Sequence, residues 1–318
     1  MNSAPPLDII NVRVTFKKAR VPLLEAISFK DKAEAYRELR LLGSVVESVI
    51  LQTCNRVELY IVASQGETLA QRVKEYLASR AGGLRDEVLK AVETSINQEA
   101  LLHLFKVASG LDSMVIGENE ILGQVWNAYL EAEKAGAAGP ILRTVFQKAL
   151  KVGKRVRNET GISRGAVSVG SVAVKLAESL LGGIDGRNVL VIGAGEMGTS
   201  VAKALVRHKP NTIFIANRTY DRALKLAAEV SGKALRFDML EEALKDADVV
   251  ICATAAPHYV LTREKVSKAV DQRLKESDMI IIDISNPRNV EKTTGTIRGV
   301  RLYCIDDLQP IVDKNLEE

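Results

Sequence analysis

The second half of this sequence alternates regularly between short apolar runs and longer helical patterns, beginning near residue 165. The runs are continuously apolar, as in parallel strands whose two sheet faces are both covered by helices. They occupy residues 188–192, 213–216, 248–253 and 279–284, and a helical pattern at 167–181 precedes them. This alternation predicts an α/β fold with a Rossmann-type, doubly wound parallel sheet.

The first half has a different pattern. Strand-like and helical stretches there follow the order strand, helix, strand, strand, helix, at residues 9–15, 32–42, 45–52, 57–63 and 68–79. This order is typical of a small split-βαβ (ferredoxin-like) α+β domain. Three further helices are predicted at residues 98–109, 118–134 and 141–158.

We therefore predict two domains joined near residues 159–165. Residues 1–160 would form a catalytic or substrate domain and residues 161–306 a dinucleotide-binding domain. Residues 307–318 would begin a C-terminal helix. A chain of 318 residues is long enough to form two domains, each with its own hydrophobic core.

The composition is that of a soluble protein, with 47% hydrophobic and 26% charged residues. We see no signal peptide, and the apolar runs are too short to span a membrane. The three cysteines are widely spaced, which fits neither a disulfide framework nor a metal site. A cytoplasmic protein without a metal is expected. The net charge of +4 does not by itself indicate a nucleic-acid binder.

A glycine-rich loop follows the first apolar run of the second domain. Gly193, Gly195 and Gly198 form G-x-G-x-x-G between a strand and a helix, the context in which this motif binds a dinucleotide pyrophosphate. The predicted cofactor loop comprises Gly193, Ala194, Gly195, Glu196, Met197 and Gly198.

The next strand ends in Asn217, Arg218 and Thr219. An NAD site usually has a carboxylate there, whereas a guanidinium and a hydroxyl can bind a 2′-phosphate. The cofactor predicted is NADPH.

Cys54 lies between two strands in the segment LQTCNRVELY, flanked by Thr53, Asn55 and Arg56. A thiolate takes an acyl group from an ester, and Arg56 could favour the thiolate. From the residues alone, an ordinary buried cysteine is an equal alternative. Cys252 lies in an apolar strand and Cys304 in the segment RLYCI, and both are predicted to be core residues.

Four segments resemble the glutamyl-tRNA reductase family. They are LQTCNRVELY, HLFKVASGLDSMVIGENEILGQV, SRGAVSVGSVAV and VIGAGEMG with the following ANRT. The resemblance implies NADPH-dependent reduction of glutamyl-tRNA(Glu) to glutamate-1-semialdehyde through a cysteine thioester. This is the first step of tetrapyrrole synthesis from glutamate. It also implies a glutamate-1-semialdehyde aminomutase as a possible partner.

The resemblance assigns roles to particular residues. Cys54 would be the nucleophile, and His103 would lie near it and support the chemistry. The residues that would line the substrate pocket are Thr53, Asn55, Arg56, Ser113, Glu118, Asn119, Glu120 and Gln124. Arg56 would suit the glutamyl carboxylate.

Each of these roles has a structural alternative. His103 could be a packed helix histidine. Glu118 and Glu120 could supply negative charge to the first turn of a helix, and Gln124 could be a helix-surface amide.

The sequence departs from the family in three places. Phe16 precedes Lys17 where the family commonly has a histidine, and Glu120 stands where it usually has glutamine. Family members continue into a helical dimerisation domain, of which this sequence has only the beginning, so homodimerisation is in doubt.

The stretch 143–157 carries six basic residues and no acidic one. Its apolar residues form a stripe at helical spacing, so the basic residues would occupy the other faces of the helix. It could meet RNA phosphates or be a solvated helix face. Two other functions remain open: an NADP-dependent dehydrogenase of a small free metabolite, similar to shikimate dehydrogenases, and a non-catalytic NADP- or tRNA-binding module.

Overall fold

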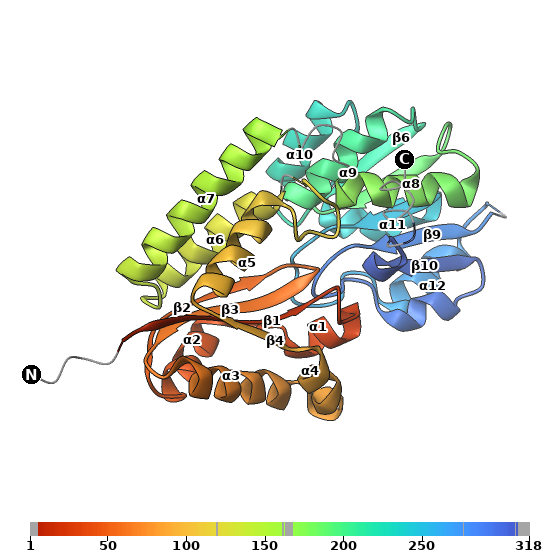
Figure 1. Ribbon diagram of the computed structural model, residues 1–318. Coiled ribbons are helices and arrows are strands. Elements are labelled where there is room, and N and C mark those ends of the chain that lie inside the picture. The colour runs from red at the N-terminus through yellow and green to blue at the C-terminus, as the bar shows by residue number, and fades with distance from the viewer. Residues whose placement is uncertain are drawn as a thin grey trace, which may run out of the picture. The chain divides into compact units, whose positions relative to one another are not determined.

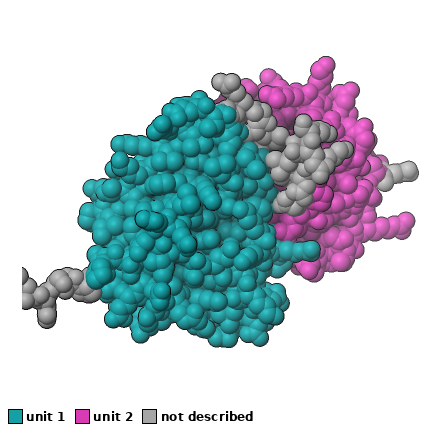
Figure 2. Space-filling view, in the orientation of Figure 1, with its two compact units in different colours: residues 1–166 teal, residues 167–318 magenta. Residues whose placement is uncertain are grey.

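A computed structural model describes residues 6–118, 120–160, 162, 168–275, 277–308 and 310. The chain divides into two compact units, residues 1–166 and residues 167–318, which are coloured separately in Figure 2. The predicted start of a C-terminal helix falls largely outside the described residues, since residues 311–318 are not among them.

Unit 1 is built on a four-stranded sheet in the order β2-β3-β1-β4, in which neighbouring strands are antiparallel. The strands are β1 (Asp8–Thr15), β2 (Val45–Gln52), β3 (Arg56–Ala63) and β4 (Glu93–Ile96). This is the order of a ferredoxin-like sheet, so the predicted fold of the first domain is confirmed. The short edge strand β4 was not predicted.

Helices cover both faces of this sheet (Figure 1). On one side lie α1 (Val21–Ile27), α2 (Lys32–Leu41), α3 (Gly66–Arg80) and α4 (Arg85–Ala91). On the other side lie α5 (Gln98–Ser109), α6 (Glu120–Lys134) and α7 (Pro140–Thr160). Because β3 is central and covered on both sides, every one of its residues is buried. A charged side chain on β3 therefore needs a partner inside the unit.

Carboxylate side chains accept hydrogen bonds from the first backbone N–H groups of two helices in unit 1. The Asp31 side chain accepts a hydrogen bond from the Glu34 backbone N–H at the start of α2. Glu47, which is buried, accepts hydrogen bonds from the backbone N–H groups of Ile141 and Leu142. These N–H groups have no partner within α7, so Glu47 ties the start of α7 to β2.

Unit 2 contains a six-stranded parallel sheet in the order β10-β9-β8-β5-β6-β7. The strands are β5 (Asn188–Ile192), β6 (Thr212–Ala216), β7 (Lys233–Leu235), β8 (Val249–Cys252), β9 (Met279–Asp283) and β10 (Val300–Cys304). This is the doubly wound Rossmann order, with the strand order reversing between β5 and β8. The fold prediction is confirmed, although the two edge strands β7 and β10 were not predicted.

The helices of unit 2 are α8 (Val169–Leu181), α9 (Glu196–Val206), α10 (Tyr220–Glu229), α11 (Leu240–Asp246) and α12 (Arg263–Asp271). Leu190 and Ile192 of β5 belong to one apolar cluster with residues of α11 and α12. Val189 and Val191 alternate with them and are also fully buried, on the opposite face. The fully apolar strands thus follow from helices on both faces. No helix within the described part of the chain is long and apolar enough to cross a membrane.

Candidate active site

Cys54 lies in the tight connection between β2 and β3. The Thr53 backbone N–H donates to the Arg56 carbonyl at 2.9 Å, and the Asn55 N–H donates to the Thr53 hydroxyl at 3.1 Å. The Asn55 carbonyl accepts from the Phe16 N–H at 2.8 Å, just beyond the end of β1. Cys54 itself is half-buried and unpaired. The hairpin therefore holds one free thiol in a fixed place at the end of the sheet.

The surroundings of Cys54 favour the protonated thiol. Burial, followed by the negative charges of Glu118 and Glu120, raises the pKa of Cys54 to about 12. Arg56 lowers the pKa of Cys54, as expected from the sequence, but its effect is smaller than those of burial and Glu118. An incoming positive charge near the two carboxylates would shift the balance toward the thiolate.

Arg56 is the centre of a buried network of charges beneath the hairpin. Its side chain is 1% exposed. Nη1 donates to Glu58 at 2.6 Å and to the Asp112 carboxylate at 3.3 Å, and Nη2 donates to the Asp112 carbonyl. The guanidinium is thus engaged by protein acceptors, which favours a role in positioning the hairpin over direct pairing with a substrate carboxylate.

Glu58 joins this network to His103. The His103 Nε2 lies 2.9 and 3.0 Å from the two Glu58 oxygens, and the Tyr60 hydroxyl donates to Glu58 at 2.7 Å. Burial alone would raise the pKa of Glu58, but His103 and Arg56 together hold it well below its ordinary value. His103 lies on α5 and is joined to the hairpin through Glu58 and Arg56.

Sequence reasoning missed Glu58. A carboxylate in the segment VELY, inside a run of apolar residues, is the signal that could have found it. Period-two alternation places it on the same face of β3 as Arg56. A buried carboxylate in a strand requires a partner, and both the neighbouring arginine and a helix histidine were available.

The loop after α5 carries Ser113 and Glu118, α6 begins at Glu120, and the charges of Glu118 and Glu120 act on Cys54. Ser113 is 6% and Glu118 is 8% exposed. Burial and the Glu120 charge raise the pKa of Glu118 to about 7, and the Ser113 hydroxyl partly opposes this. The Glu120 Oε2 is buried without a hydrogen-bond partner among the described residues. Such an atom is expected where a polar substrate binds.

Other contacts hold this loop in place. The Gly117 N–H donates to the Gly110 carbonyl at 3.0 Å, and Arg157 Nη1 of α7 donates to the Gly117 carbonyl at 3.1 Å. Gly110 has φ +78°, and a Cβ there would come within 3.1 Å of the Gly117 Cα. Lys17 forms an ion pair with Asp112, so the segment that departs from the family pattern also contacts this loop.

Two predicted substrate residues need separate mention. Gln124 is half-buried on α6, one turn after Glu120, so the two side chains lie on one face of the helix. Asn119 lies outside the described residues. The predicted substrate residues that the structure describes therefore come from the β2–β3 connection, the loop after α5 and the start of α6.

In unit 2, a pocket opens at the carboxyl ends of β5 and β8, where the strand order reverses. Its lining includes six predicted cofactor residues: Gly193, Ala194, Gly195, Asn217, Arg218 and Thr219. Glu196, Met197 and Gly198 form the first turn of α9 and are not among the lining residues. The Asn217 side chain accepts from the Ala194 N–H at 3.2 Å, which joins the glycine loop to the end of β6.

The three glycines of the loop have different structural roles. A Cβ on Gly193 would come within 2.3 Å of the Ala253 carbonyl, and one on Gly198 within 2.0 Å of the Gly193 carbonyl. A Cβ on Gly195 would meet nothing within 4 Å. Gly193 and Gly198 thus permit close packing, whereas Gly195 leaves open space in front of the backbone. That space fits a pyrophosphate at the N-terminus of α9.

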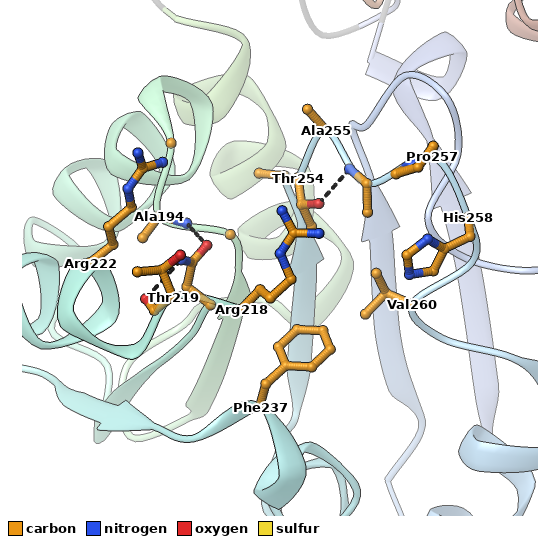
Figure 3. Close-up of a pocket in the computed structure, with 15 residues that line it drawn as sticks. Ala194, Arg218, Thr219, Arg222, Phe237, Thr254, Ala255, Pro257, His258 and Val260 are labelled. Carbon is orange, nitrogen blue, oxygen red and sulfur yellow. Dashed lines mark hydrogen bonds between the residues drawn. The ribbon is translucent and has the colours of Figure 1, made fainter. Parts of the chain in front are cut away.

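The charges of this pocket suit a 2′-phosphate. Arg218 points into the pocket between Phe237 and Thr254, and Arg222 lies beside Thr219 and Ala194 (Figure 3). The described lining residues include no carboxylate. Arg222 was missed, although it lies only four residues after Arg218, in the first turn of α10. Two guanidiniums without a competing carboxylate fit NADPH.

The opposite wall of the pocket, formed by residues 253–260, was also missed. Pro257, His258 and Val260 lie on it (Figure 3). Asn289, fully buried, donates from its side chain to the carbonyls of Ala256 at 2.9 Å and His258 at 3.3 Å. Its backbone N–H donates to Asp283 at 2.8 Å. Asn289 therefore fastens this wall to the end of β9.

Comparisons with known proteins distinguish among the functions left open by the sequence. Residues 12–160 match the family model described as "Glutamyl-tRNAGlu reductase, N-terminal domain". Glutamyl-tRNA reductase of Methanosarcina barkeri is 43% identical over 98% of this chain and 67% of its own length. That of Methanothermobacter marburgensis is 45% identical over 96% of this chain and 72% of its own length. The chain belongs to the glutamyl-tRNA reductase family.

The glutamyl-tRNA reductase family also includes a solved structure, from Methanopyrus kandleri. It is 44% identical, covers 97% of this chain and 74% of that one, and has a TM-score of 0.47. Residues 175–311 match the model described as "Shikimate / quinate 5-dehydrogenase". This second match lies within unit 2, while unit 1 matches the reductases. The likeness to shikimate dehydrogenases thus concerns the nucleotide-binding unit.

Proposed function

We propose that this chain catalyses the NADPH-dependent reduction of glutamyl-tRNA(Glu) to glutamate-1-semialdehyde, releasing tRNA. This would be the first step of tetrapyrrole synthesis from glutamate. The observation that carries the proposal is one free thiol, Cys54, held by a rigid hairpin beside the carboxylates of Glu118 and Glu120. Membership of the reductase family and the nucleotide pocket of unit 2 support it.

The first chemical step is acyl transfer to Cys54. The Sγ attacks the carbonyl carbon of the glutamyl ester, and a carbon–sulfur bond forms. The bond between that carbon and the ribose oxygen of the tRNA breaks, and the ribose oxygen takes up a proton. The thiol must lose its proton before or during the attack, because the thiolate is the nucleophilic form. The resulting thioester remains reactive enough to be reduced.

Substrate binding itself helps to ionise Cys54 in this account. The α-ammonium of the glutamyl group is a cation, and Glu118 and Glu120 are adjacent carboxylates suited to bind it. Since these two charges raise the pKa of Cys54, neutralising them lowers it. The thiol therefore stays protonated and unreactive until an aminoacyl ester is bound. The unpartnered Glu120 Oε2 would then acquire a partner.

The remaining residues of unit 1 orient this site. Arg56, Glu58 and His103 form a buried chain of hydrogen bonds that fixes the hairpin carrying Cys54. Thr53, Asn55 and Gln124 are proposed to contact the glutamyl group, as is Asn119, which lies outside the described residues. His103 supports the reaction through Glu58 in this arrangement.

The cofactor pocket fits NADPH, which when bound supplies the hydride that converts the thioester to the aldehyde and frees the Cys54 thiolate. Gly195 leaves the backbone open for the pyrophosphate, and the N-terminus of α9 provides a positive field there. Arg218, Arg222 and Thr219, which line this pocket, are proposed to bind the 2′-phosphate. Asn289 holds the facing wall in place.

We further propose a cytoplasmic location, because all three cysteines are unpaired, as in a reducing compartment. The aldehyde product is reactive, and a glutamate-1-semialdehyde aminomutase that consumes it remains a predicted partner.

The proposal is tested by following NADPH oxidation with four acceptors: glutamyl-tRNA, uncharged tRNA, free glutamate and shikimate. We expect oxidation with glutamyl-tRNA alone, together with one aldehyde formed per NADPH consumed. Oxidation with shikimate at a comparable rate would support a dehydrogenase of small metabolites instead. Binding of NADPH and tRNA without turnover of any acceptor would support a binding module.

A further inference from the structure

Helix α7 presents a row of lysines on its exposed side. We propose that Lys148, Lys151 and Lys154, here called the α7 basic face, dock the phosphate backbone of the tRNA near its acceptor end. The inference rests on the proposed function, since it assumes a tRNA substrate, and it assigns the surface of unit 1 that receives it. The Cys54 site recognises the glutamyl group, whereas this face would recognise the polyanion to which that group is attached.

The fold of α7 places these lysines in solvent. Leu142, Phe146, Ala149 and Gly153 form its buried stripe. A Cβ on Gly153 would come within 2.5 Å of the Ala108 carbonyl, so α7 packs closely against α5. The three lysines, spaced three residues apart, are all exposed on the remaining part of the helix surface. Their positions therefore follow from the amphipathic pattern of α7.

The lysines differ from the other basic residues of α7 in their partners. Arg143 forms an ion pair with Glu133 and a hydrogen bond with Tyr129, and Arg155 forms an ion pair with Glu159. Arg157 donates to the Gly117 carbonyl. Within the described ranges, no carboxylate lies within ion-pair distance of Lys148, Lys151 or Lys154. The protein therefore leaves three positive charges on this face uncompensated.

The C-terminal turn of α7 lies next to the loop that borders the Cys54 site. Arg157, one turn beyond Lys154, contacts the loop that carries Glu118, and the charge of Glu118 acts on Cys54. From Lys154 the basic face extends away from this loop, spanning about 9 Å along the helix at 1.5 Å per residue. An RNA whose 3′ end is at Cys54 would bring its backbone phosphates past this helix. Lysine suits such contacts because its ammonium acts as a point charge.

Exposed lysines on a helix are often only solvated, and the salt dependence of binding separates the two cases. Each phosphate contact that is lost reduces the slope of log Kd against log salt by about 0.7–0.9. We therefore compare the native chain with the triple variant Lys148→Gln, Lys151→Gln, Lys154→Gln. The matched control is Lys30→Gln, Lys74→Gln, Lys90→Gln, which removes the same charge from unit 1 on the side of α3 and α4.

The probe is uncharged tRNA specific for glutamate, titrated into each full-length variant at several salt concentrations. For the α7 variant we expect binding weakened about tenfold or more at low salt and a slope smaller by about 2–3. The control should change neither quantity to the same extent. In steady state, the KM for glutamyl-tRNA should rise in the α7 variant with little change in kcat. Circular dichroism verifies that each variant is folded.

Two outcomes would overturn the docking surface: unchanged affinity and salt slope in the α7 variant, or equal weakening in the control. A native chain that binds tRNA through these lysines but forms no aldehyde would support the docking surface and contradict the proposed function. The two proposals therefore fail in different ways.

Discussion

Arg56 and Glu58 form an ion pair at 2.6 Å in which both side chains are almost wholly buried. They lie two residues apart on β3, on the face that also receives His103 from α5. A buried carboxylate is costly without partners, so this pair binds the hairpin of Cys54 to the interior of unit 1. The half-buried Cys54 thus lies in a hairpin that is fixed by a buried ionic network.

Replacing Glu58 by Gln should therefore destabilise the protein. The change leaves the Arg56 guanidinium and His103 without their shared carboxylate, and breaking a buried pair costs about 3–5 kcal/mol. Urea unfolding measures the free energy. Glu75→Gln, which removes an exposed partner of Arg85, should change it little. If the free energy of unfolding fell by the same small amount in both variants, the network would not be important for stability.

The same network predicts how stability depends on pH. The pKa of Glu58 is lower in the folded protein than its ordinary value of 4.5. Below 4.5 the unfolded chain binds a proton that the folded chain does not, so the stabilisation is lost as pH falls from 4.5 toward the folded pKa. The free energy of unfolding, measured from about pH 3 to about pH 6, should fall more steeply below pH 4.5 in the native chain than in Glu58→Gln. Parallel curves would count against this assignment.

The raised pKa of Cys54 predicts slow alkylation. At neutral pH the thiol should react with iodoacetamide much more slowly than an ordinary cysteine, because little thiolate is present. Glu118→Gln removes the larger of the two raising charges and should accelerate the reaction, most clearly above the Glu118 pKa of about 7, where that carboxylate is ionised. Mass spectrometry of the Cys54 peptide gives the rate. Glu99→Gln, at an exposed site on α5, serves as the control and should leave the rate unchanged.

Cofactor preference should depend on the two pocket arginines. The double variant Arg218→Gln, Arg222→Gln loses charge-assisted hydrogen bonds to the 2′-phosphate, each worth about 1.5–3 kcal/mol. We expect the KM for NADPH to rise about 100-fold or more, while the KM for NADH changes little because NADH lacks this phosphate. Arg207→Gln, an exposed change after α9, is the control. An equal rise in the KM for NADPH and the KM for NADH would show that the arginines do not recognise the 2′-phosphate.

Asn289→Ala should loosen the far wall of the cofactor pocket. The carbonyls of Ala256 and His258 would lose their donor, at a cost of about 1–3 kcal/mol for buried groups. A lower melting temperature and a smaller stabilisation by added NADPH are expected in thermal unfolding. The comparison variant is Asn211→Ala, which removes an exposed hydrogen bond to Asn188. If NADPH stabilises Asn289→Ala as much as the native chain, the wall does not depend on Asn289.

The sequence predicted those parts of the fold where burial determines residue type. Strands β5, β8 and β9 are covered on both faces, so their apolar runs were recognisable. Strands β4, β7 and β10 lie at sheet edges and are short or partly exposed, so their residues carry no such pattern. The glycine loop and the Asn217–Thr219 segment were recognisable because their backbone and charge requirements are specific.

The site was less predictable wherever it depends on contacts between distant segments. Glu58 and His103 are 45 residues apart, and only the packing of α5 on the sheet joins them. The wall at residues 253–260 begins with small residues that carry no chemical signal, and Asn289 holds it in place. The sign of the Arg56 effect on Cys54 was predicted correctly. Its small size relative to burial and Glu118 required the folded structure.

The central claim is that Cys54 carries the glutamyl group as a thioester. Single-turnover incubation with labelled glutamyl-tRNA in the absence of NADPH tests it most directly, followed by peptide mapping and then by addition of NADPH. The account predicts one label on the Cys54 peptide, its conversion to aldehyde when NADPH is added, and neither event in Cys54→Ser. Aldehyde formation by Cys54→Ser at the native rate would contradict the account.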